Sequence, residues 1–323
     1  MPDALAPPLL AAFEGRAPDC PAWFPAALAH APERRDHEVC GVAIETLSWG
    51  DIGRPGLLLM HGKMAHADWW SFIAPFFAAT HRVVALSFAG MGGSGWREAY
   101  SVDTMADEAM GVARASGLFE GSRKPVFVGH SFGGFAGLVC ADRCGGDLGG
   151  LVMVDTPLLS RAQRERRAAE YRGPSIRGQF AQRPTKVYPQ LADALARFRF
   201  APPQDCDNLF IADHIARTSL KQVPLTDGTP GLGWTWRFDP RVADVHPGNP
   251  VRSLQAAACP VAVMWGGGSA LVTHEVAAYI AALTKPDAPH IEIPGARHHV
   301  MVDQPLALVT ALRGLLATWP QKL

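Results

Sequence analysis

The residues with the clearest chemical potential lie in the stretch from Val126 to Gly134, which reads VFVGHSFGG. A β-branched and aromatic run is followed by a turn with Ser131 at its centre, and small and apolar residues continue beyond it. Gly129 and Gly133 flank the serine in a Gly-x-Ser-x-Gly pattern, in which a strained strand-to-helix turn exposes the serine oxygen above a sheet. We therefore expect Ser131 to act as a nucleophile.

A second candidate is a carboxylate at the end of a buried strand. The run from Leu151 to Val154 is apolar and of strand length, and Asp155 follows it directly. In open sheets of parallel strands, active sites form outside the carboxyl ends of the strands. Asp155 is therefore a candidate functional residue.

These features resemble the α/β-hydrolase family. The resemblance covers residues 39–157 and 258–319, with three landmarks in the family's order. They are the serine turn, a His-Gly pair after the apolar run from Leu57 to Met60, and a histidine loop near the end of the chain. The resemblance implies an α/β fold with a mostly parallel central sheet flanked by helices, a helical cap inserted after the sixth strand, and no cofactor.

The His-Gly pair implies an oxyanion hole. In the resembling family, the backbone N–H that follows this pair helps to bind the negative charge of a tetrahedral intermediate. The corresponding donors here are the backbone N–H groups of Lys63 and Phe132, and each such donor is typically worth about 3 kcal/mol. Gly62 is needed because the backbone must approach the substrate closely.

The third landmark supplies a general base. The sequence from Pro294 to His299 reads PGARHH and resembles the family's terminal histidine loop, with Arg297 at the position of the usual second glycine. The alignment makes His298 the catalytic base, with His299 as the alternative. Asp303 is expected to be the N-cap of the final helix.

The chain departs from the commonest family pattern at the triad acid. An aspartate usually stands a few residues past the next-to-last strand, but this chain has Ser269 there, and a neutral hydroxyl cannot stabilise an imidazolium as a carboxylate does. Some family members carry the acid one strand earlier, at the position of Asp155. We expect the triad Ser131, His298 and Asp155, with Glu275 or no acid as alternatives.

Another departure lies in the glycine-rich loop after the strand from Arg82 to Leu86. The family commonly has Asp-x-x-Gly-x-Gly-x-Ser here, and this chain replaces the aspartate, which is generally structural, with Ser87. Neither a Walker lysine motif nor a full Gly-x-Gly-x-x-Gly is present, so a nucleotide site is not expected.

The rest of the sequence suggests how the chain is divided. Residues 1–37 are rich in Pro and Ala and are read as an N-terminal extension, with the first strand beginning at Val39. Residues 38–157 and 251–323 form the expected core domain. Strand patterns disappear over residues 158–250, where helical patterns and the Pro202-Pro203 break resemble the mostly helical lid that selects the substrate in many family members.

Composition excludes several classes of partner. Thirty basic residues balance thirty acidic ones among 323, so neither a nucleic-acid nor a membrane partner is expected. No apolar run approaches the roughly 20 residues that span a bilayer, and the first residues make a poor secretion signal. Six scattered cysteines agree with a cytoplasmic location. The spacing of His61, His66 and Asp68 fits no metal-ligand pattern, so no metal is expected.

The sequence therefore predicts a serine hydrolase that cleaves a carboxylic ester or a related acyl bond (lactone, thioester or amide) of a small molecule through a covalent acyl-enzyme. The alternatives are a C–C bond hydrolase, a cofactor-free perhydrolase, and a non-catalytic or slow-turnover ligand-binding protein on the same scaffold. Dehalogenases and epoxide hydrolases are disfavoured because they use aspartate where Ser131 stands. Neither the substrate's identity nor the oligomeric state can be read from the sequence.

Overall fold

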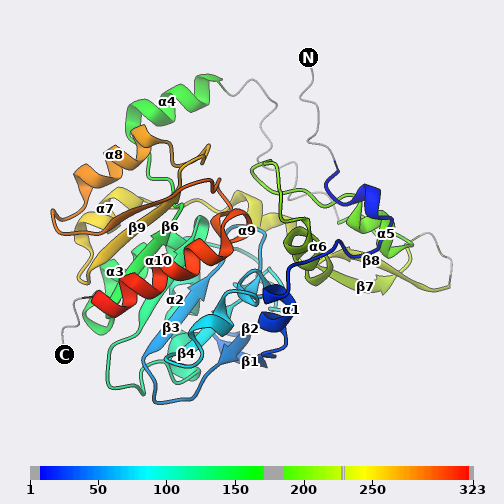
Figure 1. The fold of residues 1–323 in the computed structure, drawn as a ribbon, viewed down its shortest axis with the longest axis horizontal. Helices are drawn as coiled ribbons and strands as arrows, with labels where there is room; N and C mark the ends of the chain where they lie inside the picture. Colours follow the sequence, from blue (N-terminus) through cyan, green and yellow to red (C-terminus); the bar gives the residue numbers. More distant parts are fainter. Residues whose placement is uncertain (1–7, 171–184, 227, 229, 320–323) are drawn as a thin grey trace.

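An eight-stranded sheet forms the centre of the computed structural model, which describes residues 8–170, 185–226, 228 and 230–319. Figure 1 shows the long helix α10 (Pro305–Thr318) crossing this sheet. Only the pairings of β2 with its two neighbours are antiparallel in this sheet. In spatial order the strands are β1 (Glu33–Val39), β2 (Val42–Trp49), β4 (Arg82–Leu86), β3 (Gly56–Met60), β5 (Val126–His130), β6 (Gly150–Val154), β9 (Val261–Gly266) and β10 (His290–Ile293).

The four central strands are apolar because both of their faces are covered. Every residue of β3, β4, β5 and β6 is buried, as expected for parallel strands with helices on both sides. Leu57 and Leu59 belong to one hydrophobic cluster, whereas Leu58 and Met60 belong to the other. The predicted α/β fold with a mostly parallel central sheet is therefore confirmed.

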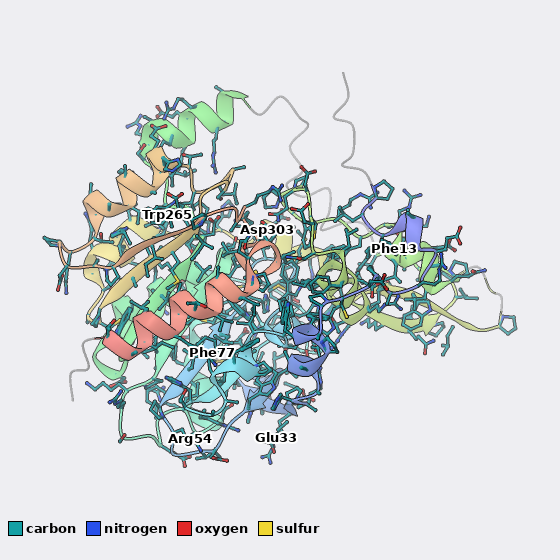
Figure 2. The ribbon with its side chains drawn as sticks, viewed as in Figure 1. Phe13, Glu33, Arg54, Phe77, Trp265 and Asp303 are labelled. Atoms are coloured by element: carbon teal, nitrogen blue, oxygen red, sulfur yellow. The ribbon has the colours of Figure 1, made fainter. Side chains whose placement is uncertain are left out.

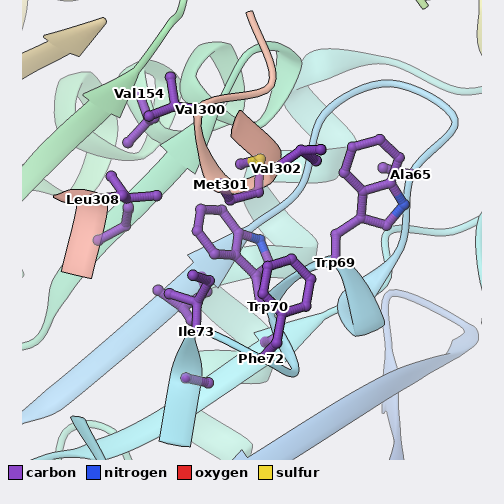
Figure 3. Close-up of a cluster of buried hydrophobic side chains, with 14 of the residues drawn as sticks. Ala65, Trp69, Trp70, Phe72, Ile73, Val154, Val300, Met301, Val302 and Leu308 are labelled. Atoms are coloured by element: carbon purple, nitrogen blue, oxygen red, sulfur yellow. The ribbon is translucent and has the colours of Figure 1, made fainter. Parts of the chain in front are cut away.

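Helices from different parts of the chain complete the two clusters. Helices α2 (Val102–Ala115), α3 (Phe132–Cys144), α7 (Pro250–Ala256) and α8 (His274–Leu283) contribute to one cluster, and α1 (Trp23–Leu28), α6 (Leu209–Thr218), α9 (Val300–Asp303) and α10 to the other. In Figure 3, Trp70 lies between Met301 and Ile73 in this second cluster. Segments distant in sequence thus form one core around the sheet.

The first strand begins earlier than the sequence indicated. We expected it at Val39, but β1 and β2 form a hairpin that starts at Glu33. Cys40 and Gly41 join the strands with φ of 52° and 75°, the left-handed geometry that two-residue hairpin turns require. β1 was missed because its charged residues face solvent at the sheet edge, where such residues prevent edge-to-edge pairing.

The segment expected to form a helical lid contains both helices and strands. Helices α4 (Arg161–Glu170), α5 (Leu191–Leu195) and α6 lie in it, but so does an antiparallel pair, β7 (Leu220–Pro224) and β8 (Leu232–Trp236). Two tryptophans, Trp234 and Trp236, lie in β8. The sequence did not indicate these two strands, but helical residues outnumber strand residues in the described part of this segment. The helical lid and the division into extension (1–37), core and lid (158–250) stay predictions.

A carboxylate from β2 contacts Ser87, the residue that stands where the family commonly has an aspartate. Glu45 Oε2 accepts hydrogen bonds from Ser87 Oγ and from the Gly93 N–H, both at 2.8 Å. Its Oε1 pairs with Arg34 at 2.5 Å and Arg237 at 3.0 Å. Burial alone would raise the pKa of Glu45, but Arg237 and the other partners lower it below its ordinary value. Glu45 therefore holds the glycine-rich loop in its charged form.

Replacing this carboxylate is expected to destabilise the fold. Glu45→Gln removes the carboxylate that Arg34 and Arg237 share. Arg34 is half-exposed and keeps its pair with Asp68, so the cost comes mainly from the buried donors that lose a charged acceptor, typically about 1 to 3 kcal/mol. Urea unfolding of the variant beside wild type measures the change. Glu38→Gln, at an exposed position on β1, is the control and should lose less than about 0.5 kcal/mol. Equal stability of the Glu45 and Glu38 variants would contradict this role.

Candidate active site

The candidate nucleophile occupies a strained turn between β5 and α3. Ser131 has φ of 51° and ψ of −116°, a conformation that non-glycine residues rarely adopt. Its backbone is held by its own N–H, which donates to the Val154 carbonyl at 2.9 Å. A Cβ on Gly129 would lie 2.5 Å from the Gly133 carbonyl oxygen. The glycines of the motif are therefore required by close backbone approach.

Strand register brings the candidate residues to one edge of the sheet. Met60 pairs with Gly129, and His130 pairs with Val154, so β3, β5 and β6 end side by side. The residues that follow these strands, including Ser131 and Asp155, consequently lie at the same carboxyl edge, where sites form in such sheets.

The structure brings Asp155 and His298 together. His298 Nδ1 lies 2.7 Å from Asp155 Oδ2, and both side chains are buried. Because a carboxylate only accepts hydrogen bonds when ionised, Nδ1 carries the proton and Nε2 is left to receive one. This is the tautomer that a general base needs when it takes a proton from a serine.

Ser269, which stands where the family's triad acid commonly stands, binds the carboxylate of Asp155. Its Oγ accepts the N–H groups of Leu271 and Val272, and donates to Asp155 Oδ2 at 2.7 Å. The Gly266 N–H donates to Asp155 Oδ1 at 3.0 Å. This contact was not predicted from the sequence, although the hydroxyl at position 269, in place of the usual acid, was a signal for it. Hydrogen bonds to a charged carboxylate stabilise that form.

The two alternative residues lie in different surroundings. Glu275 is exposed on α8 and pairs with Arg166 at 2.5 Å, so the geometry does not place it in a triad. The His299 ring is buried against Trp69 and Phe200, and neither of its nitrogens has a hydrogen-bond partner among the described residues. His299 therefore lacks the carboxylate that orients His298.

Asp303 holds the histidine loop in place, a role different from the helix N-cap that the sequence predicted. Asp303 was expected to cap the final helix, but it ends α9, and α10 has no side-chain cap. Instead, Asp303 Oδ2 accepts the Arg297 N–H at 2.7 Å, and Gln204 Nε2 donates to the same oxygen at 3.1 Å. In Figure 2, Asp303 lies where α9 meets α10. The helix starts at Pro305, which suits a first turn without a cap.

The two expected oxyanion donors flank the nucleophile in different ways. Phe132 is the first residue of α3, whose N-terminus carries partial positive charge. Lys63 follows Gly62, and a Cβ on Gly62 would lie 3.2 Å from Ser131 Cβ. The loop after β3 thus passes directly beside the serine, and a side chain at position 62 would be tightly packed against it.

A pocket adjoins the candidate base. It has a volume of about 280 Å³ and is bordered by His298, by residues of the loops after β9 and β10, and by the segment that follows α5. This volume lies near the lower end of the roughly 300–1,000 Å³ common for small-molecule sites. The other lining residues are Pro202, Pro203, Gln204, Asp205, Gly268, Ala270 and Arg297.

Among the residues that the structure describes, three buried histidines form a group that could hold a metal ion. Nitrogens of His130, His298 and His299 all lie within 4.8 Å of one another. Two histidine ligands of one zinc ion stand at most about 4.2 Å apart, since each Zn–N bond is about 2.1 Å. His130 Nε2 already donates to the His298 carbonyl at 2.9 Å. The rings would have to move to share an ion, and the expectation of no metal stays a prediction.

His61 serves as a structural link in the loop beside the serine. Its Nδ1 donates to the Gly62 carbonyl at 2.6 Å and its Nε2 accepts the Phe88 N–H at 3.0 Å. Burial lowers the pKa of His61 from 6.5 to about 3. Burial, followed by the neighbouring His298, also lowers the pKa values of His130 and His299 well below 6.5.

These shifts predict loss of stability in mild acid. Below pH 6.5 the unfolded chain gains protons at these histidines while the folded chain does not, so the free energy of unfolding falls as pH decreases from 6.5 towards 3. Each buried histidine contributes up to about 1.4 kcal/mol per pH unit. Urea unfolding at pH 7 and pH 5 should show the fall, and His61→Gln should make it shallower. His274→Gln, at an exposed position, is the control and should show the same fall in the free energy of unfolding between pH 7 and pH 5 as wild type. A His61→Gln variant with the wild-type fall would contradict the lowered pKa of His61.

Comparison with known proteins identifies the class that these features define. The sequence matches the model of the alpha/beta hydrolase family over residues 57–312, and the chain belongs to this family. It is 26% identical over 279 residues to the esterase Rv0045c of Mycobacterium tuberculosis. The aligned region covers 85% of this chain and 87% of that protein.

Solved structures show the same fold. A crystal structure of the M. tuberculosis esterase Rv0045c matches with a TM-score of 0.64 and 23% identity, covering 96% of this chain and 97% of that one. A thioesterase domain from the curacin biosynthetic pathway matches with a TM-score of 0.70 and 21% identity, covering 88% and 99% of the two chains. Within the described part of the chain, no helix is long and apolar enough to cross a bilayer.

Proposed function

We propose that this chain is a serine hydrolase that cleaves a carboxylic ester or a related acyl bond of a small molecule. The observation that carries the proposal is the 2.7 Å hydrogen bond between His298 Nδ1 and the buried Asp155, at the sheet edge where Ser131 lies. A histidine oriented in this way is suited to general-base catalysis. The sequence relationship to an esterase supports the choice of an ester.

The reaction follows the established logic of a serine nucleophile. Ser131 Oγ attacks the substrate carbonyl while His298 Nε2 takes its proton, and Asp155 stabilises the resulting imidazolium. The N–H groups of Lys63 and Phe132 bind the oxyanion of the tetrahedral intermediate. His298 then gives the proton to the leaving alcohol, and an acyl group remains on Ser131. Water, deprotonated by the same imidazole, releases the acid and restores the serine.

The pocket beside His298, whose lining residues do not include Ser131, would fit a small acyl or alcohol group. At about 280 Å³, it holds fewer atoms than a typical drug-sized ligand occupies. The similarity to a thioesterase domain adds the thioester to the acyl bonds to be tested.

We also propose that the enzyme is cytoplasmic and acts without a cofactor.

A substrate panel tests the proposal. The purified chain is incubated, without added metal or cofactor, with p-nitrophenyl esters of increasing acyl length, with lactones and with acyl thioesters. We expect turnover of at least one ester, and the fastest turnover for short acyl chains. Absence of turnover across the panel, together with saturable binding of an ester or its product, would favour a ligand-binding protein instead.

A further inference from the structure

The side chain of Lys63 makes contacts that its expected role as a backbone donor does not explain. Its Nζ donates to the carbonyl of Ala243 at 2.9 Å and to the carbonyl of Val245 at 2.8 Å, about 180 residues away in sequence. The same ammonium lies 4.6 Å from the centroid of the Phe132 ring. One side chain therefore connects both proposed oxyanion residues with η5 (Pro240–Asp244) and the residue after it.

The loop that contains Lys63 depends on such outside contacts. Met64 has φ of 59°, in the left-handed region that residues with a Cβ disfavour and adopt only where the surroundings hold them. Inside the loop, the Ala65 N–H donates to the Gly62 carbonyl at 3.2 Å. The two hydrogen bonds from the Lys63 ammonium are charge-assisted and therefore stronger than this one. They fasten the loop to the segment at residues 243–245.

The position of this loop matters because of its distance from the nucleophile. Gly62 packs so closely on Ser131 that a Cβ would lie 3.2 Å from the serine Cβ. Donors in an oxyanion hole act at about 2.7–3.1 Å from the developing charge. A displacement of about 1 Å in such a site can lower the rate about 100-fold. Small movements of the Lys63 backbone should thus weaken oxyanion binding.

We propose that the Lys63 side chain is a positioning residue that fixes the oxyanion hole by anchoring the loop at residues 62–64 to the segment at residues 243–245. This inference rests on the proposed function, since it assigns a task to the side chain of a residue whose N–H would bind the oxyanion. If the Lys63 side chain has this role, the segment at residues 243–245, which leads from β8 back to the sheet, helps to set the geometry of the reacting centre.

The variant Lys63→Met tests the proposal because it removes the ammonium and retains the backbone N–H. We expect kcat for p-nitrophenyl ester hydrolysis to fall about 10- to 100-fold, with KM changed less than about threefold, because only the transition state carries the oxyanion. Affinity for a trifluoromethyl ketone, whose adduct with Ser131 carries that charge, should fall by a similar factor. Lys63→Arg, which retains charge and donors, should recover most of the activity.

A matched control is Lys124→Met. Lys124 Nζ also donates to a backbone carbonyl, that of Gly146, but Lys124 precedes β5 and so lies at the opposite end of the strand from Ser131. The kcat of Lys124→Met should equal that of wild type. Should Lys63→Met not fold, Lys63→Gln is compared with Lys63→Arg, and the glutamine variant should show the loss of kcat.

Two results would overturn the inference. One is a folded Lys63→Met protein whose kcat and trifluoromethyl ketone affinity match wild type. The other is equal kcat for Lys63→Gln and Lys63→Arg. If hydrolysis requires Ser131 but not the Lys63 side chain, only this inference fails, whereas hydrolysis that persists in Ser131→Ala removes the proposed function itself.

Discussion

Replacing Ser131 with alanine is expected to lower kcat for ester hydrolysis by about 10⁴- to 10⁶-fold. The serine oxygen forms the bond to the acyl group, and the remaining oxyanion donors and binding contacts can supply only a small residual rate. The fold should survive, because the Ser131 side chain makes no capping hydrogen bond to α3. Steady-state kinetics with the best ester of the panel measure the effect, and circular dichroism checks the fold.

An alanine at a second serine separates this effect from general perturbation. Ser122 is exposed in the loop before β5, and Ser122→Ala should retain the kcat of wild type. A Ser131→Ala protein that keeps turnover within about tenfold of wild type would remove this serine from the mechanism, since loss of a covalent nucleophile costs far more.

The second large effect is expected at Asp155. Asp155→Asn should lower kcat about 10⁴-fold, because an amide that donates to His298 Nδ1 favours the wrong tautomer and leaves an imidazolium unstabilised. The neighbours Ser269 and Gly266 both donate to this side chain, so an asparagine NH₂ facing either donor is unfavourable and the amide has few acceptable orientations. Comparing kcat/KM for the variant and wild type gives the size of the loss.

The control for the acid is the alternative that the sequence left open. Glu275→Gln removes a charge from an exposed pair with Arg166, and exposed pairs of this kind contribute little. It should retain wild-type kcat/KM. Near-normal turnover in Asp155→Asn together with a large loss in Glu275→Gln would assign the acid to Glu275.

The central strands and the edge that they form were predictable because several local patterns agree. Buried parallel strands are continuously apolar, and a glycine-flanked serine directly after one of them specifies the turn geometry. The carboxyl end of the next buried strand then indicated Asp155. Its contact with His298, 143 residues away in sequence, required the family resemblance, because no local pattern encodes it.

Features that depend on long-range contacts escaped prediction. The strand β1 is charged and exposed, so its sequence resembles a loop until β2 pairs with it. Glu45 accepts a hydrogen bond from the Ser87 hydroxyl, 42 residues away in sequence, a contact that only the packed sheet reveals. The Lys63 ammonium reaches carbonyls on a distant segment, and backbone acceptors leave no signature in the sequence.

The most direct test of the account is the site at which a fluorophosphonate reacts. Such a reagent forms a stable adduct with a serine only where a base activates the hydroxyl and nearby donors stabilise the charge. Mass spectrometry of the digested protein is expected to show one adduct per chain on the peptide that contains Ser131, with complete loss of ester hydrolysis. Full hydrolytic activity in a protein labelled at Ser131, or inactivation by an adduct elsewhere, would contradict the account.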